Sequence, residues 1–291
     1  MRNAAKKLEK NSDRFFPFRY IFSHEIMKHI RAIPALVVAL LAGLLSQFSA
    51  VQAEPNALTE DEKEVGFQLL FDGRTLDGWE HEGNWAVEDG AIARKDKGGS
   101  LVWKVKPIPD DFELRFEWKV AERSNSGVYY RPGQYEYQIL DNGKHIDGLN
   151  PRTSAASLYF CMAPSKDATR PVGEWNKARI VCQGTVIQHW LNDEKVIDFN
   201  YLNPRWKEDI DRLAERGGKI QDRGAFLSLQ DHGDPVWYRS FRLRELKPDE
   251  DIGHETVEPA EIPEAALKKE ALILERIQKN REAREKAVKG N

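Results

Sequence analysis

The stretch YEYQILDNGKHID collects side chains that can transfer protons and bind hydroxyl groups. Glu136 and Gln138 alternate with Tyr and Ile, which is typical of the polar side of a half-buried strand. Asp141, Asn142 and His145 follow in a turn. Asp-Asn-Gly is a good turn sequence by itself, so part of this polarity needs no chemistry. Glu136 is harder to explain structurally, because a carboxylate between Tyr and Ile is costly to bury unless it lines a groove.

A second polar group occurs in AFLSLQDHGDP. Alternation along this segment places Ser228, Gln230 and His232 on one side of a strand. If that side shares a concave sheet surface with Glu136, the two segments form a groove of carboxylates, amides and imidazoles. Such a groove suits a polyhydroxylated ligand, because fixed donors and acceptors can satisfy many hydroxyl groups.

The strand pattern FELRFEWKV offers two further candidates for that groove, Arg115 and Glu117. Its apolar side is continuous, so its charged side faces either a ligand or solvent. Cross-strand ion pairs on an exposed face explain these charges more simply than a ligand does.

Motifs for metals and cofactors are weak. The chain has no His-Glu-x-x-His and no Cys-x-x-Cys, and of its 7 histidines only His145 is close in sequence to several carboxylates. The sequence leaves open whether His145 binds a cation together with Glu136, Asp141 or Asp147, and the identity of such a cation is unknown. A Ser nucleophile elbow, a phosphate-binding Gly loop and a dinucleotide fingerprint are absent from the sequence.

The elements that must position these residues are strands. Strand patterns separated by turn signals fill residues 67–246, and about a dozen of them predict an all-β fold, an antiparallel β-sandwich or jelly roll. The exception is NPRWKEDIDRLAERGGK, where Asn203 and Pro204 are typical of a helix start and the two glycines of a helix stop. We expect a short helical insert there.

Composition restricts the classes of function. The 291-residue chain has 41% hydrophobic and 10% aromatic residues, enough for a sizeable core. Its formal net charge of -3 gives no long-range field that would attract a polyanion. We therefore expect no nucleic-acid partner.

The N-terminal region has the pattern of an export signal. Basic residues after Met27 precede an apolar run, which ends in Ala-Val-Gln-Ala at Ala53. We expect a signal peptide over residues 27–53, a periplasmic or secreted product, and residues 1–26 as an upstream extension. The apolar run is shorter than the roughly 20 residues of a spanning helix, so no membrane span is expected after cleavage.

Export would place Cys161 and Cys182 in an oxidising compartment, where they can pair. Both also lie in apolar strand patterns, where a free Cys behaves as a small buried hydrophobe. The sequence leaves a disulfide between them open.

Beyond the strands, residues 247–291 form a charged, Pro-containing linker and a strongly helical segment. The helical pattern has one short apolar stripe of Leu267, Ala271 and Leu274. This stripe is a candidate surface for self-association or for docking on a partner, although a solvated helix explains it more simply.

Eight segments follow one another along the chain in the order LFDGRTLDGW, VEDGAI, NSGVYYR, YEYQILDNGKHID, ASLYF, GEWNKARI, HWLNDEKV and LQDHGDPVWYRSFRLREL. Over residues 66–246 these ordered motifs resemble the 3-keto-disaccharide hydrolase domain family. The family is similar in fold to the concanavalin-like jelly rolls, in agreement with the strand patterns.

The resemblance implies a secreted enzyme that cleaves glycosides oxidised at carbon 3 of the sugar. A ketone at carbon 3 acidifies the proton on carbon 2, so a base can remove it. The enolate then expels the aglycone from carbon 1, and water adds afterwards. Such an enzyme needs a base, an enolate stabiliser and an acid for the leaving group.

The family's polar motifs map onto catalytic candidates Glu136, His145 and His232. The resemblance implies Glu136 or His145 as the base and His232 as the acid or an orienting residue. Arg131 or a bound divalent cation is the implied enolate stabiliser. The implied substrate-binding positions are Asn125, Arg131, Gln138, Asp141, Asn142, Gln230 and Asp231.

Two other classes of function fit the same sequence. A β-sandwich with a polar groove also suits a carbohydrate-binding, lectin-like module without catalysis. The C-terminal helix fits a structural protein that assembles through it. Release of an aglycone from a 3-keto-glycoside separates the enzyme from the binding module, and the oligomeric mass after removal of residues 248–291 tests the assembly reading.

Overall fold

The computed structural model describes residues 54–133 and 135–289. The expected signal peptide and upstream extension lie outside the described residues. In the described part of the chain, no helix is long and apolar enough to cross a bilayer.

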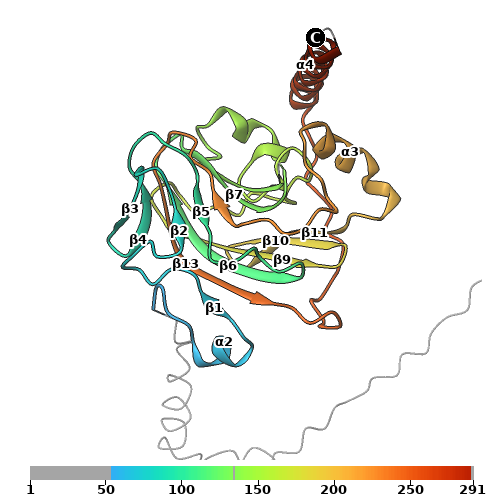
Figure 1. Ribbon diagram of the computed structural model, residues 1–291. Helices are drawn as coiled ribbons and strands as arrows, with labels where there is room; N and C mark the ends of the chain where they lie inside the picture. The colour runs from blue at the N-terminus through green and yellow to red at the C-terminus, as the bar shows by residue number, and fades with distance from the viewer. Residues whose placement is uncertain (1–53, 134, 290–291) are drawn as a thin grey trace, which may run out of the picture. The chain divides into compact units, whose positions relative to one another are not determined.

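Two antiparallel sheets form the domain, which confirms the predicted β-sandwich (Figure 1). One has eight strands in the order β11-β10-β9-β6-β13-β4-β3, with β1 also paired to β13. Its strands are β1 (Gln68–Leu69), β3 (Trp85–Glu88), β4 (Ala91–Arg94), β6 (Phe112–Val120), β9 (Asn176–Gln183), β10 (Val186–Leu191), β11 (Glu194–Asn200) and β13 (Val236–Glu245). The other has five, in the order β2-β5-β12-β7-β8. They are β2 (Trp79–Glu80), β5 (Leu101–Trp103), β7 (Asn125–Arg131), β8 (Tyr135–Leu140) and β12 (Ser228–Leu229).

The core lies between the two sheets and is rich in aromatic rings. Phe116 of β6 packs edge-on against Tyr137 of β8, with ring centroids 5.6 Å apart. Tyr130 of β7 crosses to the other sheet, where its hydroxyl bonds His189 Nε2 at 2.8 Å. Inward residues of both sheets are nearly inaccessible to solvent, because strand alternation sends every second side chain into this layer.

The outer face of the eight-stranded sheet carries a network of ion pairs. Glu113 is fully buried there and contacts Arg115, Arg179 and Arg244 at 2.6–2.8 Å. Glu117 pairs with Arg239 at 2.7 Å. The predicted placement of Arg115 and Glu117 in the groove is therefore wrong. Their strand β6 belongs to the sheet opposite β7 and β8, and its charged residues form cross-strand ion pairs instead.

Helical segments fill two connections between strands. Between β8 and β9 lie the 3₁₀ turns η2 (Ile146–Leu149) and η3 (Pro151–Thr153). Between β11 and β12 lie η4 (Pro204–Trp206) and α3 (Lys207–Glu215). Asn203 caps η4 by accepting a hydrogen bond from the Arg205 amide at 3.1 Å. The predicted helical insert is thus confirmed.

A helix lies near each end of the described chain and is tied to the sandwich. The α2 helix (Glu60–Glu64) starts with a capping box at Thr59. After β13 the chain crosses β11, where the buried Asp198 carboxylate accepts from the Glu255 amide at 2.8 Å and from His254. It then forms α4 (Glu264–Lys289).

Helix α4 docks on the domain through a face other than its apolar stripe. Leu267 and Ala271 of the stripe are exposed, whereas Ala266 and Glu270 are buried. The stripe stays a candidate surface for self-association or for docking on a partner, and a carboxylate lies on the face that docks.

Cys161 and Cys182 are both buried and both free. Burial raises the pKa of the Cys182 thiol to about 11, so it stays protonated at neutral pH. The two cysteines therefore behave as small core residues.

Candidate active site

The outer face of the five-stranded sheet brings together polar side chains from three neighbouring strands. Tyr129 of β7 stands between Ser228 of β12 and Glu136 of β8 in the register. One pair further along, Gly127 is opposite Gln138. The Gln230 amide donates to Gly127 O at 2.9 Å, so Gln230 continues the β12 row. Alternation predicted this shared face for the two segments, and the register confirms it.

Glu136 lies over the gap left by a glycine. A Cβ atom at position 127 would overlap Glu136 Oε1, so only Gly leaves room for the carboxyl group. The residue is 3% exposed. Burial raises the pKa of Glu136 to about 8 from an ordinary 4.5, and Tyr129 and Arg216 oppose this rise only in part. At pH 7 the group is mostly a neutral acid.

Tyr129 and Gln230 lie beside Glu136. Gln230 Nε2 donates to the Tyr129 hydroxyl at 2.8 Å. Tyr129 is opposite Glu136 in the register, so the proton of its hydroxyl is left for the neighbouring carboxyl group. Burial and then the neighbouring Glu136 carboxylate raise the pKa of Tyr129, so it remains a donor. Gln230 and Tyr129 thus orient the acid without taking its proton.

His145 lies at the start of η2 in a defined tautomer. Its Nδ1 accepts a hydrogen bond from the Asp147 amide at 3.1 Å. The proton of the neutral ring is therefore on Nε2, which is free to donate. The Asp147 carboxylate lies 3.8 Å from Nδ1 and also 3.5 Å from Asn125 Nδ2.

His232 approaches His145 from the opposite loop. The two ring centroids are 6.2 Å apart and the rings meet edge to face. His232 Nδ1 lies 3.4 Å from Asp234 Oδ2, and the Asn125 amide donates to the same oxygen at 3.1 Å. A proton on Nδ1 satisfies Asp234 and leaves the Nε2 lone pair available. The His232 side chain is 47% exposed, so a ligand can reach it.

Arg216 supplies the positive charge of this site, and the sequence reasoning missed it. Its guanidinium lies over the Tyr159 and Phe160 rings, 4.7 and 5.0 Å from their centroids. It also favours the ionised form of Glu136. Arg216 Nε is buried without a protein partner, a donor left for a ligand. The only indication of Arg216 in the sequence was its position, a basic residue directly before the two glycines that end the helical insert.

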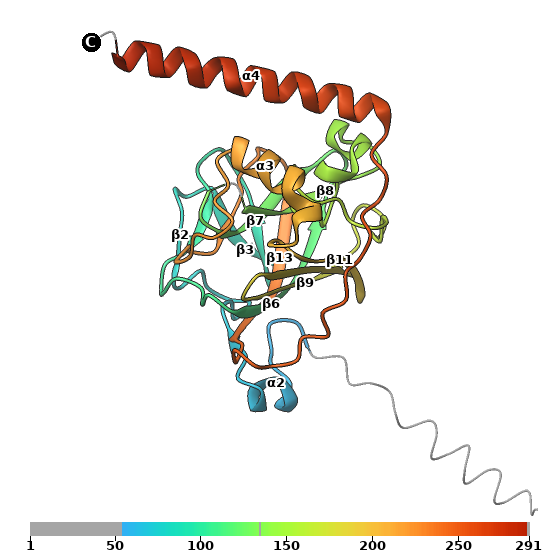
Figure 2. The same cartoon turned by 90° about the vertical axis from the view of Figure 1, so that its right-hand side faces the viewer.

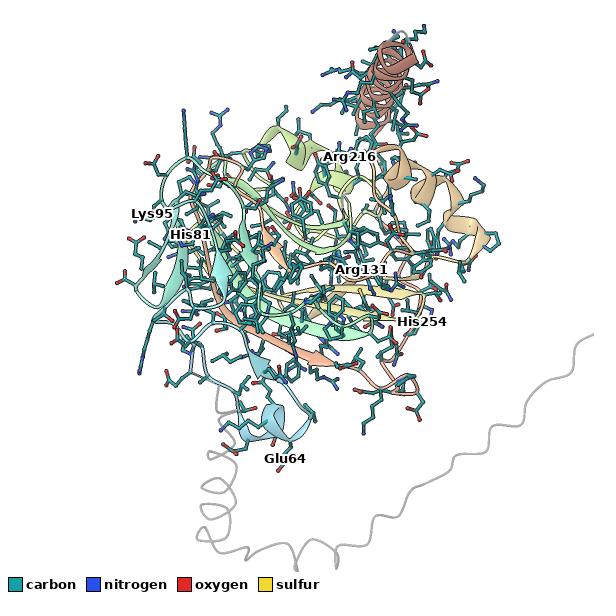
Figure 3. All side chains as sticks on the ribbon, in the orientation of Figure 1. Glu64, His81, Lys95, Arg131, Arg216 and His254 are labelled. Atoms are coloured by element: carbon teal, nitrogen blue, oxygen red, sulfur yellow. The ribbon has the colours of Figure 1, made fainter. Side chains whose placement is uncertain are left out.

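Arg131 lies elsewhere. A bulge between Tyr129 and Arg131 breaks the alternation of β7. The Arg131 guanidinium consequently contacts the Phe112 ring, at 5.6 Å, and bonds Asp110 O. Figure 3 shows Arg131 in the interior of the sandwich and Arg216 near the 3₁₀ turns. The structure does not bring Arg131 to the two histidines.

Three of the expected substrate-binding residues have their polar atoms engaged by the protein. Asp141 accepts from the Arg123 and Gly143 amides at 2.7 and 3.0 Å. Asn142 Oδ1 accepts from the Ala155 amide at 2.8 Å. These bonds shape the turn that presents His145.

Asp231 binds Arg94 Nε at 2.9 Å and Asn84 Nδ2 at 2.8 Å, which fixes the loop that carries His232. Gln138 is different, because its Oε1 is buried with no partner while Nε2 reaches Thr153 O at 3.3 Å. Its acceptor is thus left without a protein partner.

The described residues contain no group of three or more His, Cys, Asp or Glu side chains arranged to hold a metal ion. The residues around His145 therefore do not form a ligand set for the divalent cation that the resemblance left open.

Comparison with known proteins identifies the family. A model of the 3-keto-alpha-glucoside-1,2-lyase-like domain matches residues 66–244. The chain belongs to this family. This confirms the resemblance seen in the motifs, and the match contains every residue of the site described above. Helix α4 lies outside it.

Two relatives of this chain carry names that indicate carbohydrate chemistry. A 3-keto-disaccharide hydrolase from Bacteroides thetaiotaomicron is 32% identical over 233 residues, 62% of this chain and 79% of the relative. The crystal structure of a proposed glycosyl hydrolase from Parabacteroides distasonis is 28% identical. It covers 67% of this chain and 100% of that chain, with a TM-score of 0.57.

Proposed function

We propose that this protein cleaves 3-keto-glycosides or 3-keto-disaccharides by removing the proton on carbon 2 and expelling the group on carbon 1. Family membership and the name of the Bacteroides relative support the substrate class. The observation that carries the mechanism is one imidazole with a free lone pair beside one with a free N–H, near a protonated carboxyl group. A 1,2-elimination needs these three groups.

His232 is the proposed base. Its Nε2 takes the carbon 2 proton, and the Asp234 carboxylate stabilises the imidazolium that forms. Removal of this proton leaves the electron pair as an enolate, with the negative charge on the oxygen at carbon 3.

His145 and Arg216 are the proposed enolate stabilisers. His145 Nε2 can donate to the carbon 3 oxygen, since its Nδ1 is held as an acceptor by the Asp147 amide. The atoms concerned, the carbon 2 hydrogen and the carbon 3 oxygen, are neighbours on the sugar. A base and a donor on rings 6.2 Å apart suit that spacing. Arg216 adds a positive charge whose Nε has no protein partner.

Glu136 is the proposed acid. As the enolate collapses, the bond from carbon 1 to the aglycone oxygen breaks, and Glu136 gives that oxygen its proton. Its raised pKa keeps the proton available at neutral pH. Water then adds to the resulting double bond: its oxygen joins carbon 1, Glu136 takes back one of its protons, and the proton on His232 returns to carbon 2. These roles exchange Glu136 and His232 relative to those that the resemblance implied.

A chromogenic 3-keto-glucoside tests the proposal. The purified protein should release the chromophore from it. The matched glucoside with an unoxidised carbon 3 should be a poor substrate, because its carbon 2 proton is not acidic. His232→Ala and Glu136→Gln should each lower kcat by about 100-fold or more.

Two results would contradict the proposed reaction. Binding of the 3-keto-glucoside without release would instead support a lectin-like module on the same sandwich. Rapid cleavage of the unoxidised glucoside would indicate a conventional pair of carboxylates, and the elimination would be ruled out.

We also propose that the protein is exported to the periplasm or beyond, on the basis of the pattern in residues 27–53. Cell fractionation together with N-terminal sequencing of the mature protein tests it. Export predicts a mature chain that starts at Glu54, and an intact Met27 in the cytoplasmic fraction would refute it.

A further inference from the structure

We infer that helix α4 is a positioning element of the catalytic site, with Glu270 as its positioning residue. Glu270 ties the loop that carries His145 to the helix that carries Arg216. We call the contacts of Glu270 with Asn150, Arg152 and Arg212 the clamp. The catalytic consequence of the clamp rests on the proposed function, whereas the clamp itself is a property of the fold.

Glu270 is an unusual residue on this helix. It is 4% exposed, while most of α4 is open to solvent. Its carboxylate accepts from Asn150 Nδ2 and from Arg152 Nη1, both at 2.8 Å. Arg212 Nε of α3 lies 3.8 Å away. One buried carboxylate therefore joins the η2–η3 loop and α3, which come from different parts of the chain.

The other polar contacts of α4 fall on the same two segments. Lys269 Nζ lies 4.0 Å from the Asp147 carboxylate. Arg281 Nη2 bonds both the side chain and the carbonyl oxygen of Glu215, at 2.8 and 3.0 Å. Glu215 is the residue before Arg216. Figure 2 shows α4 extending along the side of the sandwich where the 3₁₀ turns and α3 lie.

The loop partners of Glu270 lead directly to catalytic groups. Asn150 donates its amide to Asp147 O at 3.2 Å and so closes η2, whose first residue follows His145. Arg152 O accepts from the Phe160 amide at 2.7 Å, and Arg216 stacks on Phe160. A shift of Asn150 or Arg152 therefore moves both sides of the site.

Charge balance makes the clamp depend on Glu270. Arg152 and Arg212 are both mostly buried and share Asp209, at 3.5 and 2.9 Å. Without Glu270, two guanidinium groups face one carboxylate in a partly dehydrated place. Buried pairs that lose one partner are strongly destabilised, so the loop and α3 are expected to separate.

Glu270→Gln is the decisive variant in the full chain, because it keeps the volume and one acceptor but removes the charge. We expect kcat on the 3-keto-glucoside to fall about 10- to 100-fold while KM changes less, since displacement of catalytic groups by about 1 Å has effects of this size. Glu264→Gln, on the exposed start of the same helix, is the matched control and should leave kcat unchanged.

Two further measurements keep the test independent of turnover and of global folding. Hydrogen exchange of residues 145–153 and 207–216 should speed up in Glu270→Gln, without a change in the strands. Glu270→Asp, which keeps the negative charge, should retain more of the kcat than Glu270→Gln does.

The outcomes separate the two proposals. If the wild type does not release the chromophore, the proposed function fails. Hydrogen exchange alone then shows whether Glu270 holds the two segments together. Unchanged exchange in Glu270→Gln would overturn the clamp. Faster exchange with unchanged kcat in an active enzyme would overturn the positioning role.

Discussion

The Glu136 side chain leans diagonally across the β7–β8 pair onto Gly127, so closely that position 127 has no room for a side chain. A Cβ atom there would overlap the Glu136 carboxyl oxygen. The acid of the site is therefore held against bare backbone, beneath Tyr129 and beside Arg216. This close approach is what keeps Glu136 buried on a polar face.

Gly127→Ala should displace the Glu136 carboxyl group and lower kcat by about 10-fold or more, because the methyl group cannot fit beside it. Steady-state kinetics on a 3-keto-glucoside, with a melting curve for each variant, checks this. Gly143→Ala is the control, since a methyl group there meets only Asp141 Oδ1, at an ordinary 3.5 Å. Equal kcat values for both variants would contradict this account.

The pH dependence of activity distinguishes an acid from a base at position 136. If Glu136 acts as an acid, kcat/KM, which reports the free enzyme, falls as pH rises through about 8, the pKa at which burial places it. If it acts as a base, kcat/KM rises over the same interval. A profile between pH 6 and 9.5 should show the fall, and Glu136→Gln should lack it at its lower rate.

The same group makes stability depend on pH. Its folded pKa of about 8 lies above the ordinary 4.5, so its contribution is fully present below pH 4.5 and is lost as pH rises through about 8. The loss should be on the order of a few kcal/mol. Thermal melting from pH 4.5 to 8.5 should show a smaller decline of Tm in Glu136→Gln than in the wild type. Parallel declines would argue against the buried acid.

Asp234→Asn should lower kcat by about 10- to 100-fold, because an amide no longer stabilises the imidazolium of His232 and can hold the wrong tautomer. KM should change little. Asp193→Asn, at an exposed hairpin, is the matched control. A loss of activity in both variants would point to a general charge effect instead.

Substitution of Arg216 and of Arg131 tests which of the two guanidinium groups stabilises the enolate. Arg216→Met should lower kcat/KM by about 10-fold or more, since Arg216 is the charge that acts on Glu136. Arg131→Met should mainly lower Tm, because Arg131 packs on Phe112 and bonds a backbone oxygen. The reverse result would restore Arg131 as the enolate stabiliser that the motifs implied.

Strand alternation and capping residues, which are local, determined much of this protein. They predict the β-sandwich, the helical insert after Asn203, and the shared side of Glu136 and Gln138. These predictions succeed because side-chain direction in a strand and the chemistry of a helix start depend on a few neighbouring residues.

Tertiary structure decided which of the polar sides meet. The strand of Arg115 and Glu117 alternates as clearly as that of Glu136, yet it pairs into the opposite sheet. Alternation gives the side of a strand but not its partner, because pairing depends on contacts between residues far apart in the sequence. A single bulge likewise moved Arg131 away from the site.

Contacts between loop residues were the least predictable from the sequence. Asp234 meets the Asn125 amide across 109 positions, and Glu270 meets Arg152 across 118. No periodic pattern marks such pairs, since loop conformation is set by the scaffold on which the loop rests. The sequence by itself therefore determined the strands and the residue types of the site, while the packing of loops and of α4 decided which of those residues form it.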